Sequence, residues 1–129
     1  MRAKWCCAIL LLAALIAVAQ EGHPLAGTWH GSWGPNPTER TDVTFVMEWD
    51  GKGIGGIINP GFDGMRIQNA TLEAGWMVHF EADAKDSGGN AVRIVINGKI
   101  ENVTNARRSI AGTWTQGARR GDFKIVRDN

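Results

Sequence analysis

The chain has 129 residues, with 17 glycines, six tryptophans and no tyrosine, and its 14 Lys and Arg against 13 Asp and Glu give a formal net charge of +1. A charge this close to zero provides no argument for binding nucleic acid or an anionic membrane. The length fits a single domain that can bury a core of its own.

The N-terminus has the composition of a targeting segment. Arg2 and Lys4 precede a purely apolar run over residues 8–18, and Ala17-Val18-Ala19 forms an A-x-A cleavage site. The run is shorter than the roughly 20 residues that a membrane-spanning helix needs. We therefore predict a signal peptide over residues 1–19, cleaved after Ala19, with no membrane association afterwards. An uncleaved N-terminal anchor is the alternative.

Both cysteines, Cys6 and Cys7, lie within this segment, so the chain after residue 19 has none. Small secreted animal proteins commonly depend on disulfides. A cysteine-free exported domain instead favours a bacterial periplasmic or secreted protein. Removal of Arg2 and Lys4 leaves twelve Lys and Arg against 13 Asp and Glu, a net charge of −1. We expect residues 20–25 to form a flexible tail before a single domain over residues 26–129.

A short motif occurs twice in this domain. Ala26-Gly27-Thr28-Trp29 recurs as Ala111-Gly112-Thr113-Trp114, close to the other end of the chain. The repeat indicates that the first strand and a late strand have equivalent positions, as when a sheet curls round and closes. We predict that Trp29 and Trp114 are closure residues that pack near one end of the fold.

The clearest local structure is a hairpin over residues 41–59. Val43, Phe45, Met47 and Trp49 alternate with polar or smaller residues, which places them on one face of a strand. Asp50-Gly51 then predicts a tight turn, and residues 53–59 form the partner strand.

Similar segments follow along the chain. Residues 65–68, 76–81 and 92–96 alternate in the same way, with a loop over residues 83–90. Asn97-Gly98 predicts a turn or bulge, after which residues 99–103 continue. Residues 110–115 and 122–127 form a last pair joined through 116–117. With residues 27–33 at the start, we count about eight strands.

Eight short antiparallel strands with one apolar face form either a sandwich or a barrel, and only the barrel removes the unpaired edges. Glycines within strands, such as Gly31, Gly55 and Gly112, indicate bends and close backbone approaches, which a sharply coiled small barrel requires. We therefore predict an all-β fold: an antiparallel meander of about eight strands, closed into a small up-and-down barrel.

The apolar faces would line the interior of that barrel, and they carry Trp29, Trp33, Val43, Phe45, Met47, Trp49, Met65, Ile67, Trp76, Val78, Phe80, Val92, Ile94, Ile96, Phe123 and Ile125. Eight strands leave an interior that is either filled by side chains or able to hold one small ligand. Tryptophan in this number is more bulk than a tight core usually contains. We predict an aromatic-lined ligand site formed by Trp33, Phe45, Met47, Trp49, Trp76 and Phe80. The alternative is that these aromatics fill the core.

Catalytic and metal-binding signals are weak. His30 and His79 fall on the outward faces of their strands, and no H-x-H, H-E-x-x-H, G-x-S-x-G or P-loop pattern occurs. We predict no catalytic residue, no metal and no cofactor, and thus a protein that is not an enzyme. The last quarter of the chain is basic, including Arg119 and Arg120; we interpret these as solvent-facing charges, with an anion or acidic-partner site as the alternative.

The chain resembles the calycin-like small barrels, above all the avidin type. The likeness rests on Gly27-Thr28-Trp29 in the first strand, its second copy at 112–114, the glycine-rich residues 53–57 and the closing Gly121-Asp122-Phe123. The same layout is similar to that of short exported bacterial proteins of unknown function. The resemblance implies a barrel with a lumen. It does not imply biotin, because the chain has no tyrosine and His30 follows the first G-T-W.

Two functions are compatible with these features. We favour a non-enzymatic exported barrel that binds a small hydrophobic or aromatic ligand in its lumen. The alternative is a periplasmic inhibitor that binds another protein through residues 20–24 or through the loop at 83–90. The sequence predicts no nucleic-acid partner and does not determine an oligomeric state.

Overall fold

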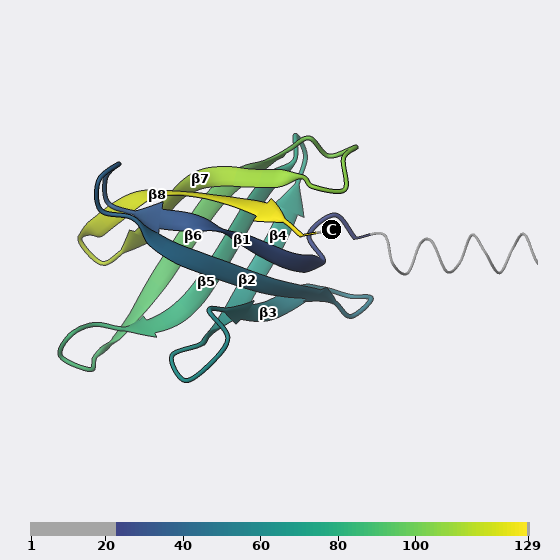
Figure 1. The fold of residues 1–129 in the computed structure, drawn as a ribbon. Helices are drawn as coiled ribbons and strands as arrows, with labels where there is room; N and C mark the ends of the chain where they lie inside the picture. Colours follow the sequence, from purple (N-terminus) through teal and green to yellow (C-terminus); the bar gives the residue numbers. More distant parts are fainter. Residues whose placement is uncertain (1–22, 129) are drawn as a thin grey trace, which may run out of the picture.

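The computed structural model describes residues 23–128, and all of its regular secondary structure is β-strand. Eight strands follow one another: β1 (Gly27–Gly34), β2 (Thr41–Trp49), β3 (Ile54–Ile58), β4 (Met65–Glu73), β5 (Met77–Lys85), β6 (Ala91–Glu101), β7 (Ser109–Gln116) and β8 (Arg119–Arg127). Each strand pairs antiparallel with the next, and β1 also pairs with β8, so the sheet closes into a barrel (Figure 1). Within residues 23–128 no helix is long and apolar enough to cross a membrane.

The predicted fold class, an antiparallel meander closed into a barrel, is therefore confirmed. The predicted hairpin over residues 41–59 is also present, with β2 paired to β3. Its turn is held by Asp50, whose carboxylate accepts hydrogen bonds of 2.8 Å from the N–H groups of Lys52 and Gly53. These bonds to the ionised form lower the pKa of the Asp50 carboxyl.

The expectation of a turn or bulge at Asn97-Gly98 was wrong. Strand β6 passes through both residues without a shift in its pairing with β5 or β7. Gly98 provides space rather than a turn, because a Cβ atom there would lie 3.0 Å from the Phe123 ring.

The antiparallel order divides the connections between two ends of the barrel. We call one the open end; it carries the loops at residues 35–40, 59–64, 86–90 and 117–118. The other, the closed end, carries residues 23–26, 50–53, 74–76 and 102–108. In Figure 1 the open-end loops lie at the left and lower left, and both ends of the described chain lie at the right.

The interior is a continuous apolar core, made of Leu25, Trp29, Val43, Phe45, Met47, Ile58, Ile67, Val78, Phe80, Ala82, Ile94, Ile96, Ile100, Ile110, Trp114, Phe123 and Ile125. Three phenylalanines occupy its middle. The ring centroid of Phe45 lies 6.0 Å from that of Phe80 and 6.3 Å from that of Phe123. Aromatic rings at these separations attract one another. The three buried rings together fill the barrel at mid-height.

Residues 23–25 seal the closed end. Leu25 and Trp29 are fully buried, and the indole N–H of Trp29 donates a 3.0 Å hydrogen bond to the carbonyl of Leu25. Arg108 donates to the carbonyl of Pro24 at 3.1 Å, and the ring of His23 stacks on Trp49 with centroids 4.5 Å apart.

Of the predicted tail over residues 20–25, the structure describes residues 23–25, which are packed against the barrel. The reason is that Leu25 supplies the apolar side chain that covers the end of the core. The predicted signal peptide over residues 1–19, and residues 20–22, lie outside the described residues.

The prediction that Trp29 and Trp114 pack near one end of the fold was wrong, because the two tryptophans lie at opposite ends. Trp29 is the third residue of β1 and pairs with Arg127 at the closed end. Trp114 is the sixth residue of β7 and pairs with Gly121 near the open end. Because β1 and β7 run in the same direction, different positions along the two strands place the indoles at opposite ends.

Glycines permit the tight coiling of the sheet. A Cβ atom on Gly31 would lie 1.8 Å from the carbonyl oxygen of Lys124, and one on Gly112 would lie 2.0 Å from that of Asn97. Neither distance is compatible with a side chain. The close approach of β1 to β8, and of β6 to β7, therefore requires glycine at these positions.

We predict that Leu25→Ala lowers the free energy of unfolding by about 2–5 kcal/mol, because it removes a fully buried side chain and leaves a cavity beside Trp29. Urea unfolding followed by circular dichroism measures the change. Phe62→Ala is the matched control: Phe62 is fully exposed, so its removal should change stability by less than about 0.5 kcal/mol. An unchanged Leu25→Ala protein would show that residues 23–25 do not seal the barrel.

Candidate binding site at the open end of the barrel

Strand alternation directs a set of side chains into the open end. On β8, Phe123 and Ile125 are buried. Arg119 lies four residues before Phe123 and is therefore on the same, inward face of the strand. On β7, Gln116 lies two residues after the buried Trp114 and is therefore on the same, inward face. On β2, Thr41 lies two residues before the buried Val43 and is also on the inward face. Trp33 and Ile94 are directed inward from β1 and β6. The open end thus combines apolar rings with polar groups.

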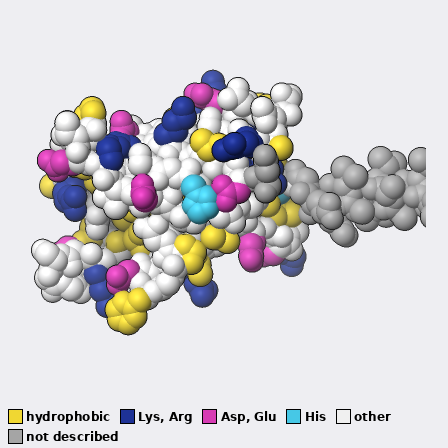
Figure 2. Space-filling model, viewed as in Figure 1, with side chains coloured by type: hydrophobic (Ala, Val, Ile, Leu, Met, Phe, Trp, Pro, Cys, Tyr) yellow, Lys and Arg dark blue, Asp and Glu magenta, His cyan; other side chains and the backbone are white. Residues whose placement is uncertain are grey.

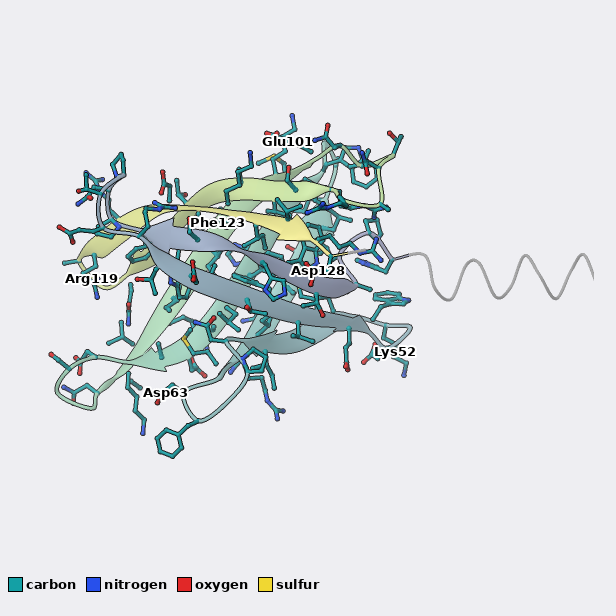
Figure 3. All side chains as sticks on the ribbon, viewed as in Figure 1. Lys52, Asp63, Glu101, Arg119, Phe123 and Asp128 are labelled. Carbon is teal, nitrogen blue, oxygen red and sulfur yellow. The ribbon has the colours of Figure 1, made fainter. Side chains whose placement is uncertain are left out.

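These side chains enclose a pocket of about 180 Å³, lined by Trp33, Gly34, Pro35, Thr41, Ile94, Trp114, Gln116 and Arg119. Two indoles form its walls, with ring centroids 6.2 Å apart. The indole N–H of Trp114 donates a 3.0 Å hydrogen bond to the carbonyl of Asp122, which fixes the orientation of that ring. Figure 3 shows Arg119 at this end of the barrel and Lys52 and Asp128 at the other.

A wider hollow of about 690 Å³ adjoins the pocket toward β3, β4 and β5, and it is lined by Trp33, Asn59, Phe62, Asp63, Gly64, Met65, Asp83, Ala84, Lys85, Ala91, Ile94 and Gln116. Trp33, Ile94 and Gln116 belong to both linings. The two spaces therefore form one recess, which we call the open-end recess. Figure 2 shows hydrophobic side chains between charged ones at this end of the molecule.

The recess ends on an aromatic floor. The ring of Phe45 meets Trp33 edge-on, with centroids 6.4 Å apart. Below it, Phe45, Phe80 and Phe123 are fully or almost fully buried. The lumen is therefore filled from the closed end up to mid-height, and its remaining space lies next to solvent.

The loops at the rim of the recess are held by hydrogen bonds that involve polar side chains. Asn36 accepts from the backbone N–H groups of Thr38 at 3.0 Å and Glu39 at 2.8 Å. Arg40 binds Asp122 and donates to the carbonyl of Ser32 at 3.1 Å, which ties this loop to β1 and β8. In the opposite loop, Asp86 accepts from two backbone N–H groups at 2.9 Å.

Gly121 makes room for one wall of the pocket. A Cβ atom at this position would lie 2.7 Å from Cζ2 of Trp114 and 2.1 Å from the carbonyl oxygen of Gly34. The glycine therefore lets β8 pass close to β1 while the Trp114 ring lies against it. The sequence contains this signal as the segment Gly121-Asp122-Phe123.

The structure separates the six residues proposed for the ligand site. Trp33 lines the open-end recess, and Phe45 meets it from the floor, where Phe80 packs against Phe45. Met47 is buried toward the closed end, where it pairs with Gly27. Trp49 and Trp76 lie at the closed end. Trp76 follows β4 in a turn, has a positive φ of 61° and is 41% exposed. The structure therefore brings Trp33 and Phe45 together but does not bring Trp49 or Trp76 to them.

Three polar residues of the pocket were not predicted from the sequence as site residues: Thr41, Gln116 and Arg119. Their inward phase could have been read from the alternation of β2, β7 and β8. Arg119 was not recognised because the last strand was expected to begin at residue 122, whereas β8 begins at Arg119.

Arg119 is the cation of the pocket. The carbon of its guanidinium lies 5.9 Å from the centre of the Trp114 ring, within the range of a cation–π contact. No carboxylate of residues 23–128 forms an ion pair with it. The donor groups of this guanidinium therefore remain available at the edge of the pocket.

A second polar cluster lies on the outer surface of β4, β5 and β6, beside a hollow of about 550 Å³. His79 donates from Nδ1 to the Asn97 amide oxygen at 2.7 Å and from Nε2 to the Glu81 carboxylate at 2.8 Å. Arg93 donates to Glu81 at 3.0 Å and to Asp83 at 2.8 Å. As predicted, both His79 and His30 are directed away from the lumen.

The geometry of this cluster shifts two pKa values. Because both imidazole nitrogens face oxygen acceptors, the protonated ring donates to both, and the bond to Glu81 contributes most to raising the pKa of His79. Hydrogen bonds from His79, Arg93 and Asn69 lower the pKa of the Glu81 carboxyl to about 2. His79, Glu81, Arg93 and Asp83 are therefore each paired with an oppositely charged group of the same cluster. Among residues 23–128 no three His, Cys, Asp or Glu side chains are arranged to hold a metal ion.

We predict that the stabilising effect of His79 depends on pH. It is fully present below the ordinary histidine pKa of 6.5 and is lost as pH rises through the raised pKa of the folded state. The Glu81 contribution is present above its ordinary pKa of 4.5 and is lost as pH falls toward about 2. His79→Gln should therefore lower the urea unfolding midpoint more at about pH 5.5 than at about pH 9.

The control for this measurement is Glu48→Gln, which removes an exposed carboxylate outside the cluster; its effect should be the same at both pH values. An equal decrease at both pH values for His79→Gln would contradict the ion-paired arrangement.

Comparison with known proteins does not place the chain in a family. No family model matches it, no curated protein matches it, and no solved structure matches it.

Proposed function

We propose that this protein is a non-enzymatic barrel that binds one small molecule with an apolar or aromatic body in the open-end recess. The observation that carries the proposal is the pocket of about 180 Å³ whose wall includes the contacting indoles of Trp33 and Trp114. Ligand sites in proteins combine apolar and aromatic walls with a few polar groups, and this pocket adds Thr41, Gln116 and Arg119 to its rings.

The size of the pocket supports an aromatic ring as the part of the ligand that enters it. An apolar cavity of about 150 Å³ in another protein binds benzene. The inner pocket is slightly larger and is open toward the wider hollow, which would accommodate a substituent. A planar ring in this pocket would gain aromatic contact with the indoles in its wall.

The architecture is consistent with the same proposal. Closed antiparallel barrels of eight strands include lipocalins and streptavidin, which hold one small ligand at the mouth or in the lumen. The calycin-like resemblance of the G-T-W elements supports this comparison, although fold alone does not determine function. We also propose that the protein acts in the periplasm or outside the cell, on the basis of the composition of residues 1–19.

The alternative, a protein inhibitor, stays a proposal with a narrower basis. Of residues 20–24, His23 and Pro24 are described, and they pack against the barrel rather than projecting from it. The loop at residues 86–90 is held by its own hydrogen bonds to Asp86. Phe62, fully exposed on the neighbouring loop, is the side chain that best fits insertion into a partner.

We predict that the protein binds benzamide, a neutral single-ring probe, and that Trp33→Ala weakens this binding about tenfold. Loss of one aromatic wall removes roughly 0.5–1.5 kcal/mol of ring contact, and a factor of ten in affinity corresponds to about 1.4 kcal/mol. Isothermal titration calorimetry with benzamide, supported by quenching of tryptophan fluorescence, measures the affinity.

Trp76→Ala is the matched control, because it removes an indole at the closed end and should leave benzamide binding unchanged. Thermal unfolding of both variants confirms that each is folded. Absence of benzamide binding, or equal weakening by both substitutions, would exclude the open-end recess as the binding site.

A further inference from the structure

We propose that the ligand of the open-end recess is an aromatic monocarboxylate whose carboxylate is bound by Arg119. This inference rests on the proposed function, since it names the chemical class of molecule that the same recess would select. It is carried by the position of one guanidinium beside a pocket of single-ring size.

Arg119 lies at the edge of the pocket, so its positive charge is next to any bound ligand. It is the first residue of β8 and has the inward phase of the buried Phe123. Its guanidinium lies over the face of Trp114, one of the two indole walls, and the residue itself lines the pocket. A ring bound in the pocket would therefore have a cation close to it.

Arg119 is the one arginine of residues 23–128 that lines the inner pocket, and like Arg66, Arg107, Arg120 and Arg127 it forms no ion pair. Arg40 binds Asp122, Arg93 binds Glu81 and Asp83, and Arg108 donates to the backbone carbonyls of Pro24 and Asn105. A guanidinium presents its N–H donors in a planar fork that matches the two oxygens of a carboxylate.

A neighbouring amide extends the polar edge. Gln116 is paired with Arg119 in the register of β7 and β8, and both residues line the pocket. The Gln116 side chain has N–H donors of its own. An anionic group at this edge would therefore meet a charged donor and a neutral one from two adjacent strands.

The charges around the recess favour a single negative charge on the ligand. Arg119 is the one charged residue in the lining of the inner pocket. The wider hollow carries Lys85 together with Asp63 and Asp83, so it adds no net positive charge. The one guanidinium of Arg119 balances the single negative charge of a monocarboxylate. A phosphate dianion would carry more negative charge, and Asp63 and Asp83 would repel it while Lys85 adds one further cation.

The test compares benzoate with benzamide, which have the same ring and nearly the same shape but differ in charge. In the unmodified protein benzoate should bind about tenfold more tightly than benzamide, because a charge-assisted hydrogen bond is roughly twice as strong as a neutral one. Arg119→Gln should remove this preference, so that benzoate and benzamide bind with about equal affinity. Arg119→Lys, which keeps the charge but not the fork, should retain part of it.

Arg120→Gln is the matched control. It makes the same change of charge one residue further along β8, on the outward face, and should preserve the preference for benzoate. Benzamide binding without a preference for benzoate would overturn the role of Arg119 and leave the proposed function intact. Equal effects of Arg119→Gln and Arg120→Gln would also overturn it, since overall charge would then explain the preference. Binding of neither probe would overturn both proposals.

Discussion

Pairing of β1 with β8 is the constraint on which the rest of the structure depends. Once these strands pair, every strand has two neighbours, and no sheet edge is left to bind another chain. A ligand must then meet the outer surface or one end of the barrel. The two ends differ because Leu25 and Trp29 fill one of them, while the phenylalanine cluster fills the middle. The space that remains is bordered by Trp33 and Trp114.

The close packing of the barrel and the recess at its open end both depend on glycines within the strands. Glycines such as Gly31 and Gly121 let neighbouring strands approach to distances that no side chain would allow. The barrel is therefore narrow enough for single aromatic residues to fill it at mid-height. At the open end the same approach holds the Trp114 ring against β8, where Arg119 covers its face. The geometry of the pocket is thus set by backbone contacts as well as by its lining.

Period-two alternation predicted the strands, because one apolar face must be buried along its whole length. Closure was predicted from the repeated A-G-T-W element, from glycines within strands such as Gly31, and from the removal of unpaired sheet edges. The ends of strands carried less information. Trp76 continues the alternation of β5 in the sequence, but it follows Gly75 in a turn of positive φ and remains outside the lumen. Arg119 and Gly121 provide no apolar signal, so the start of β8 and the polar edge of the pocket were missed. The contacts of Pro24 with Arg108 and of His23 with Trp49, which hold residues 23–25 at the closed end, are long-range and are not predicted by a local pattern.

The most direct test of the account follows the indole N–H resonances of Trp29, Trp33, Trp49, Trp76 and Trp114 in a ¹⁵N-labelled sample during titration with benzamide. If the barrel is sealed at one end and binds ligand at the other, the resonances of Trp33 and Trp114 shift with a common saturation curve, and the other three remain in place. Saturable shifts at Trp49 and Trp76, with Trp33 and Trp114 unchanged, would contradict the account by placing the ligand at the closed end.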